Sequence, residues 1–483
     1  MTVLIGLWLI ALVVPLTQAE KNVVCYYGSW SSYRHGNGQF VVDRIDPLLC
    51  THLIYSFVGV NANGTVRVLD PWLDLEDNWG LATMKKFTSL KKINTNLKTL
   101  VAVGGWNVGS ETFSDVAQNA VLRARFAQDA AEFCVRHEFD GLDVDWEYPA
   151  QRDGDPMVDR DNFVHLLSDL RQELSKRGLL LTAAVAAAET SASISYNIPE
   201  ISKYLDFINL MTYDLHGPWE ATTGHHAALH AGPNDVTVAQ QQLNVESCVM
   251  FWLAAGAPAE KLNLGVAFYG RTFTLRSASE NHIGALSSGP GQGGLYSQEL
   301  GFLGYNEICE KLLTDRWYFK WDEDQQVPYA FSGNQWVGFD NAESLTLKCD
   351  LVNLHGLAGA MVWSIETDDF NGRCGDKFGL LGALRAGLKN GDTITSVSAT
   401  TLTKEPTTVS AGTMTTTETS TAVSSTAASS EFNCSVTGFF RDPMDSAKFY
   451  YCDDLTRHDF HCPFGTYFDI TILACDWASN VQC

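Results

Sequence analysis

The chain has 483 residues, with 33 Lys and Arg against 56 Asp and Glu, and a formal net charge of −23. A protein this acidic repels phosphate backbones and anionic lipid surfaces, so we expect neither nucleic acid nor membrane as a partner. The hydrophobic content of 45% and the aromatic content of 11% exclude global disorder. The length exceeds that of an ordinary compact domain and predicts one large folded unit with a smaller one attached.

The first 19 residues have the pattern of a secretory signal peptide. Residues 4–15 form an apolar run, and the small residues Thr17 and Ala19 favour cleavage after Ala19. The run is shorter than the roughly 20 residues that cross a bilayer, although a buried strand or helix is an alternative interpretation. We therefore predict a secreted, extracellular protein whose 12 cysteines are mostly paired in disulfides. The sequons at Asn63 and Asn433 are candidate glycosylation sites.

Eight apolar runs, separated by helix-like segments, organise residues 20–390. Amphipathic stretches such as residues 117–137 and 161–177 lie between the runs. Strands that alternate with helices predict a parallel sheet, and eight such units predict an α/β fold, the closed (β/α)8 TIM barrel. The seventh connection, about residues 271–345, is long enough to hold an inserted α+β domain. The predicted strands are residues 22–30, 51–60, 98–106, 139–147, 179–187, 207–214, 263–270 and 357–366.

The composition changes sharply after residue 390. More than half of residues 393–430 are Ser or Thr, so we predict that residues 391–431 form an unfolded linker, typical of an O-glycosylated stalk. Residues 432–483 contain five cysteines, and a module this small needs disulfides to stay folded. We therefore predict a small disulfide-rich β module after the linker.

Three carboxylates alternate along the fourth predicted strand, at Asp143, Asp145 and Glu147. Alternate side chains share one face of a strand, and active sites of such barrels form at the C-terminal ends of the strands. Neighbouring negative charges raise each other's pKa, and a Glu that stays protonated near neutral pH is what a general acid requires. A calcium site or a solvated acidic loop end is the alternative. Calcium sites favour flexible loops, whereas these carboxylates alternate with apolar residues as in a buried strand.

Residues 139–149 resemble the signature of glycoside hydrolase family 18 chitinases, and the similarity extends from about Asn22 to Leu388. Four further blocks resemble that family in order, although Ala102 stands where many members have Ser. Residues 434–483 resemble a peritrophin-type chitin-binding module, so the whole arrangement is similar to that of arthropod chitinases. The four blocks are residues 100–106, 211–214, 269–271 and 359–364.

The resemblance implies an endo-acting chitinase that hydrolyses β-1,4 linkages of N-acetylglucosamine polymers with retention of configuration. This family uses the substrate's own 2-acetamido group in place of an enzyme nucleophile. Glu147 would be the general acid and base, Asp145 would orient the acetamido group, and Asp143 would share a proton with Asp145. Tyr213 would hydrogen-bond the acetamido oxygen, and Asp214 would contact the distorted sugar. No cofactor is expected, and a monomer would bind chitin and its oligosaccharides.

Aromatic residues would line the substrate groove, because flat rings match the apolar faces of sugars. By the same resemblance, Trp363 would form the floor of the −1 subsite. Four tryptophans outside the family pattern, Trp8, Trp79, Trp252 and Trp317, are expected to pack in the core. The full set expected to bind substrate is Tyr26, Trp30, Gly105, Trp106, Met211, Trp219, Tyr269, Arg271, Glu299 and Trp363.

The resemblance also implies a disulfide pattern. The C-terminal module of relatives has six cysteines, but Ser446 stands at the second position here and leaves Cys483 without a partner. Cys134, Cys248 and Cys349 have no assigned partner, and Cys134 is expected to be a buried thiol. The implied pairs are Cys25–Cys50, Cys309–Cys374, Cys434–Cys452 and Cys462–Cys475. The aromatic residues expected to bind chitin in the module are Tyr450, Tyr451, Tyr467 and Trp477.

Three other interpretations compete with these expectations. His225, His226 and His230 superficially resemble a metal cluster, but no carboxylate follows at a spacing typical of zinc ligands, so we predict no metal. A catalytically inactive chitin-binding lectin has the same fold, but such relatives usually lack the acid that this chain has in Glu147. A hydrolase acting on the N,N′-diacetylchitobiose core of glycoproteins is disfavoured by the aromatic groove and the C-terminal module.

Overall fold

The structure is a computed structural model that describes residues 20–400 except 315, and five strands between residues 438 and 477. The described residues form two compact units, one on each side of the Ser/Thr-rich segment. The predicted signal peptide, Asn433 and most of the predicted linker lie outside the described residues. No helix within the described residues is long and apolar enough to span a bilayer.

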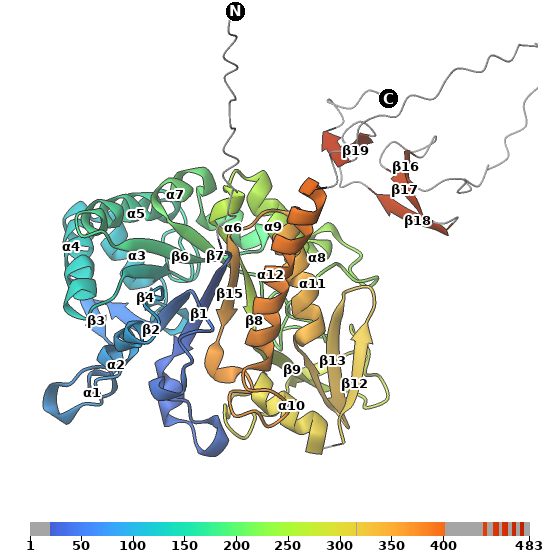
Figure 1. Cartoon of the computed structure of the whole chain (residues 1–483), viewed down its shortest axis with the longest axis horizontal. Coiled ribbons are helices and arrows are strands. Elements are labelled where there is room, and N and C mark those ends of the chain that lie inside the picture. The colour runs from blue at the N-terminus through green and yellow to red at the C-terminus, as the bar shows by residue number, and fades with distance from the viewer. Residues whose placement is uncertain are drawn as a thin grey trace, which may run out of the picture. The chain divides into compact units, whose positions relative to one another are not determined.

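A closed parallel barrel forms the large unit, as the sequence predicts (Figure 1). Its strands pair in the order β1, β2, β4, β5, β6, β7, β8 and β15, and β15 pairs back with β1 to close the ring. A short antiparallel strand, β3 (Val66–Val68), extends β2 outside the ring. The barrel strands are β1 (Asn22–Gly28), β2 (His52–Val60), β4 (Lys98–Gly104), β5 (Gly141–Asp145), β6 (Leu180–Ala186), β7 (Phe207–Met211), β8 (Leu262–Ala267) and β15 (Gly359–Trp363).

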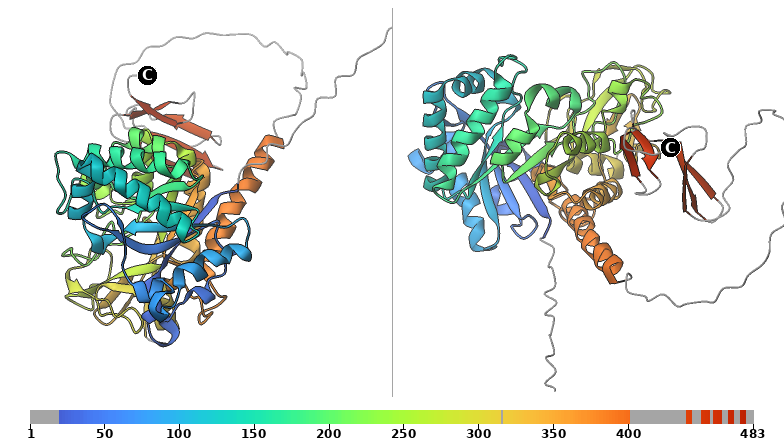
Figure 2. Two further views of the ribbon diagram at one scale, coloured as in Figure 1. Left: turned by 90° about the vertical axis from the view of Figure 1, so that its left-hand side faces the viewer. Right: turned by 90° about the horizontal axis from the view of Figure 1, so that it is seen from above.

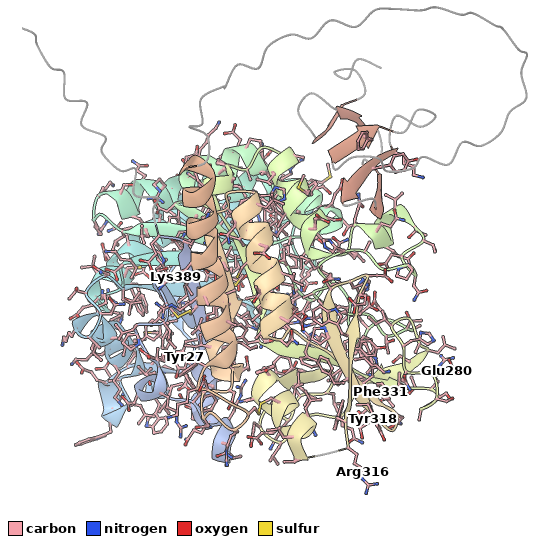
Figure 3. All side chains as sticks on the ribbon, turned by 45° about the vertical axis from the view of Figure 1, so that its right-hand side comes forward. Tyr27, Glu280, Arg316, Tyr318, Phe331 and Lys389 are labelled. Carbon is pink, nitrogen blue, oxygen red and sulfur yellow. A yellow bond between two sulfur atoms is a disulfide. The ribbon has the colours of Figure 1, made fainter. Side chains whose placement is uncertain are left out.

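Helices cover the outside of the ring (Figure 2). In α4, the Asn119 side chain accepts hydrogen bonds from the first backbone N–H groups, and the apolar face from Phe126 to Cys134 is buried against the strands. Two helices, α11 and α12, lie side by side, and the amide of Asn353 donates to the carbonyl of Gly387 between them (Figure 3). The helices are α1 (Pro71–Asp74), α2 (Thr83–Ser89), α3 (Glu111–Gln118), α4 (Ala120–Arg136), α5 (Asp159–Ser175), α6 (Glu189–Ser195), α7 (Ile198–Tyr204), α8 (Val238–Gln241), α9 (Val245–Ala254), α10 (Tyr305–Thr314), α11 (Ala342–Leu354) and α12 (Gly379–Thr400).

An antiparallel sheet with α10 fills the seventh connection, which confirms the predicted α+β insertion. Its first strand begins two residues after β8 ends, with only Phe268 between them, so the insertion starts directly at the barrel mouth. The rings of Tyr318 and Phe331, on neighbouring strands, lie 5.6 Å apart (Figure 3). The strands are β9 (Tyr269–Leu275), β10 (Ser287–Pro290), β11 (Phe302–Gly304), β12 (Tyr318–Asp322), β13 (Val327–Ser332) and β14 (Gln335–Gly338).

The cysteines of the barrel unit separate into paired and buried groups. Both implied disulfides are present, Cys25–Cys50 and Cys309–Cys374. Burial raises the pKa of the remaining thiols, Cys134, Cys248 and Cys349, to about 12, so they behave as apolar core residues.

The C-terminal unit is built from short antiparallel strands, as predicted. A three-stranded sheet is accompanied by a separate two-stranded one. Tyr450 is buried, which favours packing over direct stacking on sugar. The side chains of Tyr451, Tyr467 and Trp477 and the pairs Cys434–Cys452 and Cys462–Cys475 lie outside the description, as does Cys483. The strands are β16 (Gly438–Arg441), β17 (Lys448–Asp453), β18 (Thr456–His461), β19 (Thr466–Asp469) and β20 (Ala474–Trp477).

Candidate active site

The alternation predicted for the fourth barrel strand places its carboxylates inside the barrel. Leu142 and Val144 of β5 are completely buried in the core between the strands and the surrounding helices. Asp143 and Asp145 alternate with them, so both carboxylates point to the opposite, inner side. Glu147 lies beyond the end of β5 and is partly exposed at the barrel mouth.

The chain just after β5 is anchored from the outside. Trp146 is buried, stacks on Phe113 with ring centroids 5.4 Å apart, and donates its indole N–H to Ser110 Oγ at 2.9 Å. The Ser110 hydroxyl in turn donates to the carbonyl of Tyr148 at 2.8 Å. These contacts on both sides of Glu147 fix the backbone that carries its side chain.

Asp143 is the deepest carboxylate, and its hydrogen-bond donors are neutral. The hydroxyls of Tyr26 and Thr182 donate to its two oxygens at 2.6 and 2.5 Å. Burial raises the pKa of Asp143 to about 6, although hydrogen bonds from Thr182, Tyr26 and Asn209 lower it in part. Asp143 therefore loses its proton at a higher pH than an exposed aspartate does.

Below Asp143, a chain of amides crosses the barrel interior. Asn209 donates to the Tyr26 hydroxyl at 3.1 Å, and Asn263 donates to the side-chain oxygen of Asn209 at 3.0 Å. By resemblance, Tyr26 was expected to line the substrate groove. The residue is only 1% exposed, and its hydroxyl instead donates a hydrogen bond to Asp143. Tyr26 lies on β1 below Trp363, and the two ring centroids are 5.5 Å apart. This position explains why Tyr26 is buried and not in the groove.

The pKa values of Asp145 and Glu147 are both raised. Burial raises the pKa of Asp145 well above its ordinary value, and the charges of Glu147 and Asp143 raise it further. One oxygen, Asp145 Oδ1, is buried without any hydrogen-bond partner. Burial also raises the pKa of Glu147 to about 7, a hydrogen bond from Tyr148 lowers it, and the charge of Asp214 raises it again. The site thus holds a proton donor beside an unoccupied carboxylate acceptor.

Asp214 has the opposite electrostatic setting. The guanidinium of Arg271 donates to both of its oxygens, at 2.7 and 2.6 Å, and the Tyr269 hydroxyl donates at 2.8 Å. Burial alone would raise its pKa, but the Arg271 charge and hydrogen bonds outweigh burial and hold the pKa well below the usual range. Behind it, Nδ1 of the buried His226 lies 3.4 Å from Asp214 Oδ1. Tyr269 and Arg271, expected to bind sugar, thus also hold Asp214.

Tyr213 lies next to Asp214, at the base of the site. Its side chain is largely buried, and within the described part of the chain its hydroxyl has only the thioether of Met361 as an acceptor, at 3.6 Å. A thioether accepts hydrogen bonds weakly. The Tyr213 hydroxyl is therefore available to a stronger acceptor on a bound molecule.

An aromatic platform stands beside the carboxylates. The Trp363 ring lies 5.7 Å from Phe57 and 6.1 Å from Trp30, and Trp30 stacks nearly parallel to Phe57. Phe57 was not among the residues expected to bind substrate, and its packing against Gly105 is visible only in the structure. A Cβ on Gly105, whose φ is +84°, would lie 2.7 Å from the Phe57 ring, so only glycine fits there.

Two further tryptophans present their rings to solvent, one after β4 and one after β7. Trp106 and Trp219 are 59% and 61% exposed. The guanidinium of Arg152 lies 3.9 Å from the Trp106 ring and donates to the carbonyls of Trp106 and Glu147. Arg271 similarly lies 5.7 Å from the Trp219 ring. Of the remaining expected residues, Met211 ends β7 and is half-buried, and Glu299 is exposed between β10 and β11.

Comparison with known proteins assigns the family. Residues 22–368, more than half of the chain, match the glycosyl hydrolases family 18, and residues 434–483 match the chitin binding Peritrophin-A domain. The chain belongs to glycoside hydrolase family 18.

Relatives in this family include both hydrolases and a protein described as a pseudo-chitinase. The chain is 42% identical over 366 residues to the Drosophila melanogaster protein named Probable chitinase 2, covering 74% of each chain. The Ostrinia furnacalis Group IV chitinase, solved with allosamidin, is 48% identical with a TM-score of 0.75, covering 77% of this chain and 100% of that one. Human YKL-39, described as a pseudo-chitinase with retained chitooligosaccharide binding, is 38% identical with a TM-score of 0.70, over 76% and 100%.

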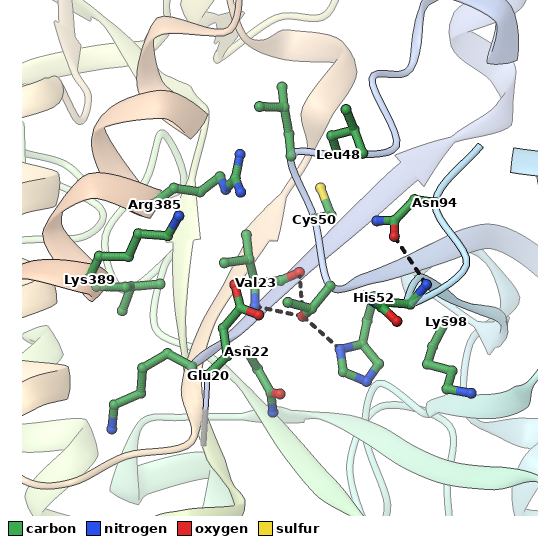
Figure 4. Close-up of a pocket in the computed structure, with 15 residues that line it drawn as sticks. Glu20, Asn22, Val23, Leu48, Cys50, His52, Asn94, Lys98, Arg385 and Lys389 are labelled. Carbon is green, nitrogen blue, oxygen red and sulfur yellow. Dashed lines mark hydrogen bonds between the residues drawn. The ribbon is translucent and has the colours of Figure 1, made fainter. Parts of the chain in front are cut away.

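A group of histidines and a cavity were not part of the expected catalytic set in this family 18 barrel. The histidines considered as a zinc cluster bond separately, His225 to the carbonyl of Phe339, His226 to that of Tyr269 and His230 to the Glu246 carboxylate. A cavity of about 390 Å³ lies at the opposite, N-terminal end of the strands and includes no predicted site residue (Figure 4).

The four tryptophans expected to pack in the core have different outcomes. Trp252 is fully buried and donates its indole N–H to the carbonyl of Ala187, as expected of a core residue. Trp317 is half-buried against Lys311. The prediction for Trp79 is wrong, because that side chain is 97% exposed. Trp8 lies outside the described residues.

Proposed function

We propose that this protein is a secreted, endo-acting chitinase that cleaves β-1,4 linkages of N-acetylglucosamine polymers with retention of configuration. The observation that carries the proposal is the pair formed by Glu147, with its pKa near 7, and Asp145, with one buried oxygen lacking a partner. A protonated acid beside an empty acceptor suits a substrate that brings both a leaving oxygen and an N–H group.

Bond cleavage would begin with proton transfer. Glu147 donates its proton to the glycosidic oxygen, and the carbonyl oxygen of the neighbouring acetamido group attacks the anomeric carbon as the glycosidic bond breaks. Asp145 accepts the acetamido N–H and stabilises the positive charge that spreads over the resulting oxazolinium ion. The Tyr213 hydroxyl donates to the acetamido oxygen, which is a better acceptor than its Met361 partner.

Hydrolysis of the intermediate would return the site to its starting state. Glu147, now ionised, removes a proton from water, the water oxygen attacks the anomeric carbon, and the ring of the oxazolinium opens. Two displacements at one carbon restore the original β configuration. Asp214 stays ionised through both steps because of Arg271, and accepts hydrogen bonds from the sugar at the −1 subsite.

The remaining features of the chain fit a polymeric substrate. Trp363, Trp30 and Phe57 offer stacking faces on one side of the carboxylates, and Trp106 and Trp219 offer exposed rings at the mouth. The module at residues 434–483 would hold the enzyme on solid chitin and raise the local substrate concentration. No metal or cofactor takes part in this mechanism.

A second candidate is a chitin-binding protein without turnover, because a similar structure, human YKL-39, is described as a pseudo-chitinase. Product analysis with chitin oligosaccharides of increasing length separates the two. An endo-acting chitinase releases internal fragments from the longer substrates, and its rate rises with chain length as more of the groove is filled. Binding without any product would establish the second candidate.

A further inference from the structure

Two neighbouring histidines lie buried behind Asp214, in the segment that follows β7. His225 and His226 are both fully buried, and their ring centroids are 5.6 Å apart. The mechanism above uses neither ring. A buried imidazole destabilises a protein unless its ring nitrogens have suitable partners, so the partners of these four nitrogens decide what each ring can do.

The neutral form of His225 satisfies both of its nitrogens. Its Nε2 lies 2.9 Å from the carbonyl oxygen of Phe339, and because a carbonyl oxygen only accepts, Nε2 carries the hydrogen. Its Nδ1 accepts from the backbone N–H of Ala227 at 3.1 Å, which requires a bare lone pair. Burial, and then the charges of His226 and Lys348, hold the pKa of His225 well below its ordinary value. This ring therefore stays neutral.

His226 has one satisfied nitrogen and one without a partner. Its Nε2 lies 3.1 Å from the carbonyl oxygen of Tyr269, so Nε2 also carries a hydrogen. Its Nδ1 is then a bare lone pair in the neutral ring, and this buried atom has no hydrogen-bond partner within the described part of the chain. Oδ1 of Asp214 lies 3.4 Å away. Two lone pairs at this distance repel each other, whereas a proton on Nδ1 turns the same contact into an ion pair.

The active-site side of His226 carries charges of both signs. Asp214 follows β7, and Tyr269 and Arg271 lie on β9, with the Tyr269 ring 4.9 Å from the imidazole. Burial lowers the pKa of His226, the contact with Asp214 and its charge raise it, and the charge of Arg271 lowers it again. The net pKa is below the ordinary value, so His226 gains its second proton in acid, beside a carboxylate that is still ionised.

The far side of His226 is electrically balanced. His225 is neutral, and beyond it Lys348 of α11 forms a fully buried ion pair with Asp340 at 2.6 Å. Lys348 also donates to the carbonyl of Ala227, one residue after His226, at 2.7 Å. This ion pair fixes the backbone that holds both rings, and its two charges oppose each other. The carboxylate that governs the protonation of His226 is therefore Asp214.

We propose that His226 is a positioning residue for Asp214, because it takes up the proton that would otherwise neutralise this carboxylate in acid. The proton enters through Asp214, whose side chain is 33% exposed, and passes from Oδ1 to the lone pair of Nδ1. An imidazolium then donates to an ionised carboxylate. Arg271, Tyr269 and His226 together hold Oδ1, while Oδ2 accepts from Arg271 alone among the described residues and is left for the sugar. The role of Asp214 towards the sugar rests on the proposed function.

Histidine NMR on the full chain tests the titration directly. With ¹³C-labelled histidine, the resonance that His226→Asn removes should titrate below pH 6.5. Asp214→Asn should lower its midpoint by about one pH unit or more, because the carboxylate favours the imidazolium. The resonance that His225→Gln removes is the internal control and should not titrate while the protein stays folded. A His226 ring that stays neutral until unfolding, or whose midpoint ignores Asp214→Asn, would overturn the inference.

The kinetic test is made where Arg271 no longer dominates the charge of Asp214. In the Arg271→Gln background, His226→Phe should raise the acid-side midpoint of kcat/KM by about one pH unit, which is an extra loss of about tenfold on that limb. His226→Asn keeps an N–H near the position of Nδ1 and should recover most of this loss. An equal loss at every pH would show a merely structural role and refute the inference. If the wild type turns over no substrate, the proposed function fails, and the NMR titration, which needs no turnover, still decides whether His226 shares the proton of Asp214.

Discussion

Two groups of carboxylates share one barrel mouth and differ in their electrostatic surroundings. Asp143, Asp145 and Glu147 follow one strand with hydroxyls, amides and each other as neighbours, and burial raises the pKa of all three. Asp214 follows β7 and receives two hydrogen bonds from the Arg271 guanidinium, which holds its pKa well below the usual range.

The comparison shows that the counter-charge, and not burial, decides which carboxylate keeps a proton. Burial raises the pKa on both sides, and the direction is reversed only at Asp214, whose two carboxylate oxygens accept hydrogen bonds directly from the Arg271 guanidinium. A glycosidase needs both states at once, an acid that is protonated and a carboxylate that stays ionised beside the developing positive charge. Substitutions that change the protonation of each group of carboxylates in turn test this difference.

The largest effect is expected from removing the proton donor. Glu147→Gln keeps the shape of the side chain but has no proton to give, so turnover should fall by roughly 10²–10⁴-fold or more, while oligosaccharide binding persists. In the wild type, kcat/KM should decline as the pH rises through about 7, because Glu147 then loses its proton. Near-normal turnover by Glu147→Gln would exclude Glu147 as the acid.

The next largest effect is expected from removing the positive charge that pairs with Asp214. Arg271→Gln removes the counter-charge, so the pKa of Asp214 rises and its protonation adds a new decline of kcat/KM on the acidic side, with a loss of roughly 10–10²-fold near the optimum. The lost charged hydrogen bonds should also lower stability by roughly 1.5–3 kcal/mol. Arg123→Gln, which removes a pair with Asp169 on the outer helices, should leave the pH profile unchanged.

A smaller effect is expected from removing one hydrogen-bond donor of Asp143, in the first group of carboxylates. Tyr26→Phe removes one hydroxyl donor from Asp143, so the pKa of Asp143 should rise above its wild-type value of about 6 and the rate should fall by less than about tenfold. The pH dependence of kcat/KM measures the shift. Tyr27→Phe removes a hydroxyl that bonds Ser32, away from the carboxylates, and should leave the profile as it is.

The smallest effect on the chemistry is expected from the C-terminal module. Deleting residues 401–483, after the end of α12, should leave the rate on soluble oligosaccharides unchanged, because every carboxylate and its partners lie in the barrel unit. The rate on insoluble chitin should fall, since the module raises the local substrate concentration. Equal rates on solid chitin for both chains would show that the module has no part in catalysis there.

The local sequence pattern predicts the direction of the first group of carboxylates, but not the pairing of Asp214 with Arg271. Period-two alternation over residues 141–145 is local, so it predicts both the strand and the inward direction of Asp143 and Asp145. The hydroxyl that donates to Asp143 comes from Tyr26, 117 positions away, and only the closure of β1 against β2 and β15 brings it there. Arg271 reaches Asp214 because β9 follows β8 directly, a register that no local pattern reports.

The wrong prediction for Trp79 has a similar cause. Composition shows an apolar ring and favours burial, whereas the left-handed backbone at Asn78 and Trp79 that turns the ring outward appears only in the fold. Phe57 was missed because its neighbours in space, Trp30 and Trp363, lie on other strands' ends. Barrel strands and their polar ends are thus readable from the chain, and contacts between strand ends are not.

The stereochemistry of the first product tests the central claim most directly. If protonated Glu147 acts with the substrate's acetamido group, ¹H NMR of a fresh oligosaccharide digest should show the β-anomer first, with the α-anomer appearing only by mutarotation. The α-anomer as the initial product would mean direct attack by water, and would contradict the assignment of Asp145 and Glu147 to substrate-assisted cleavage.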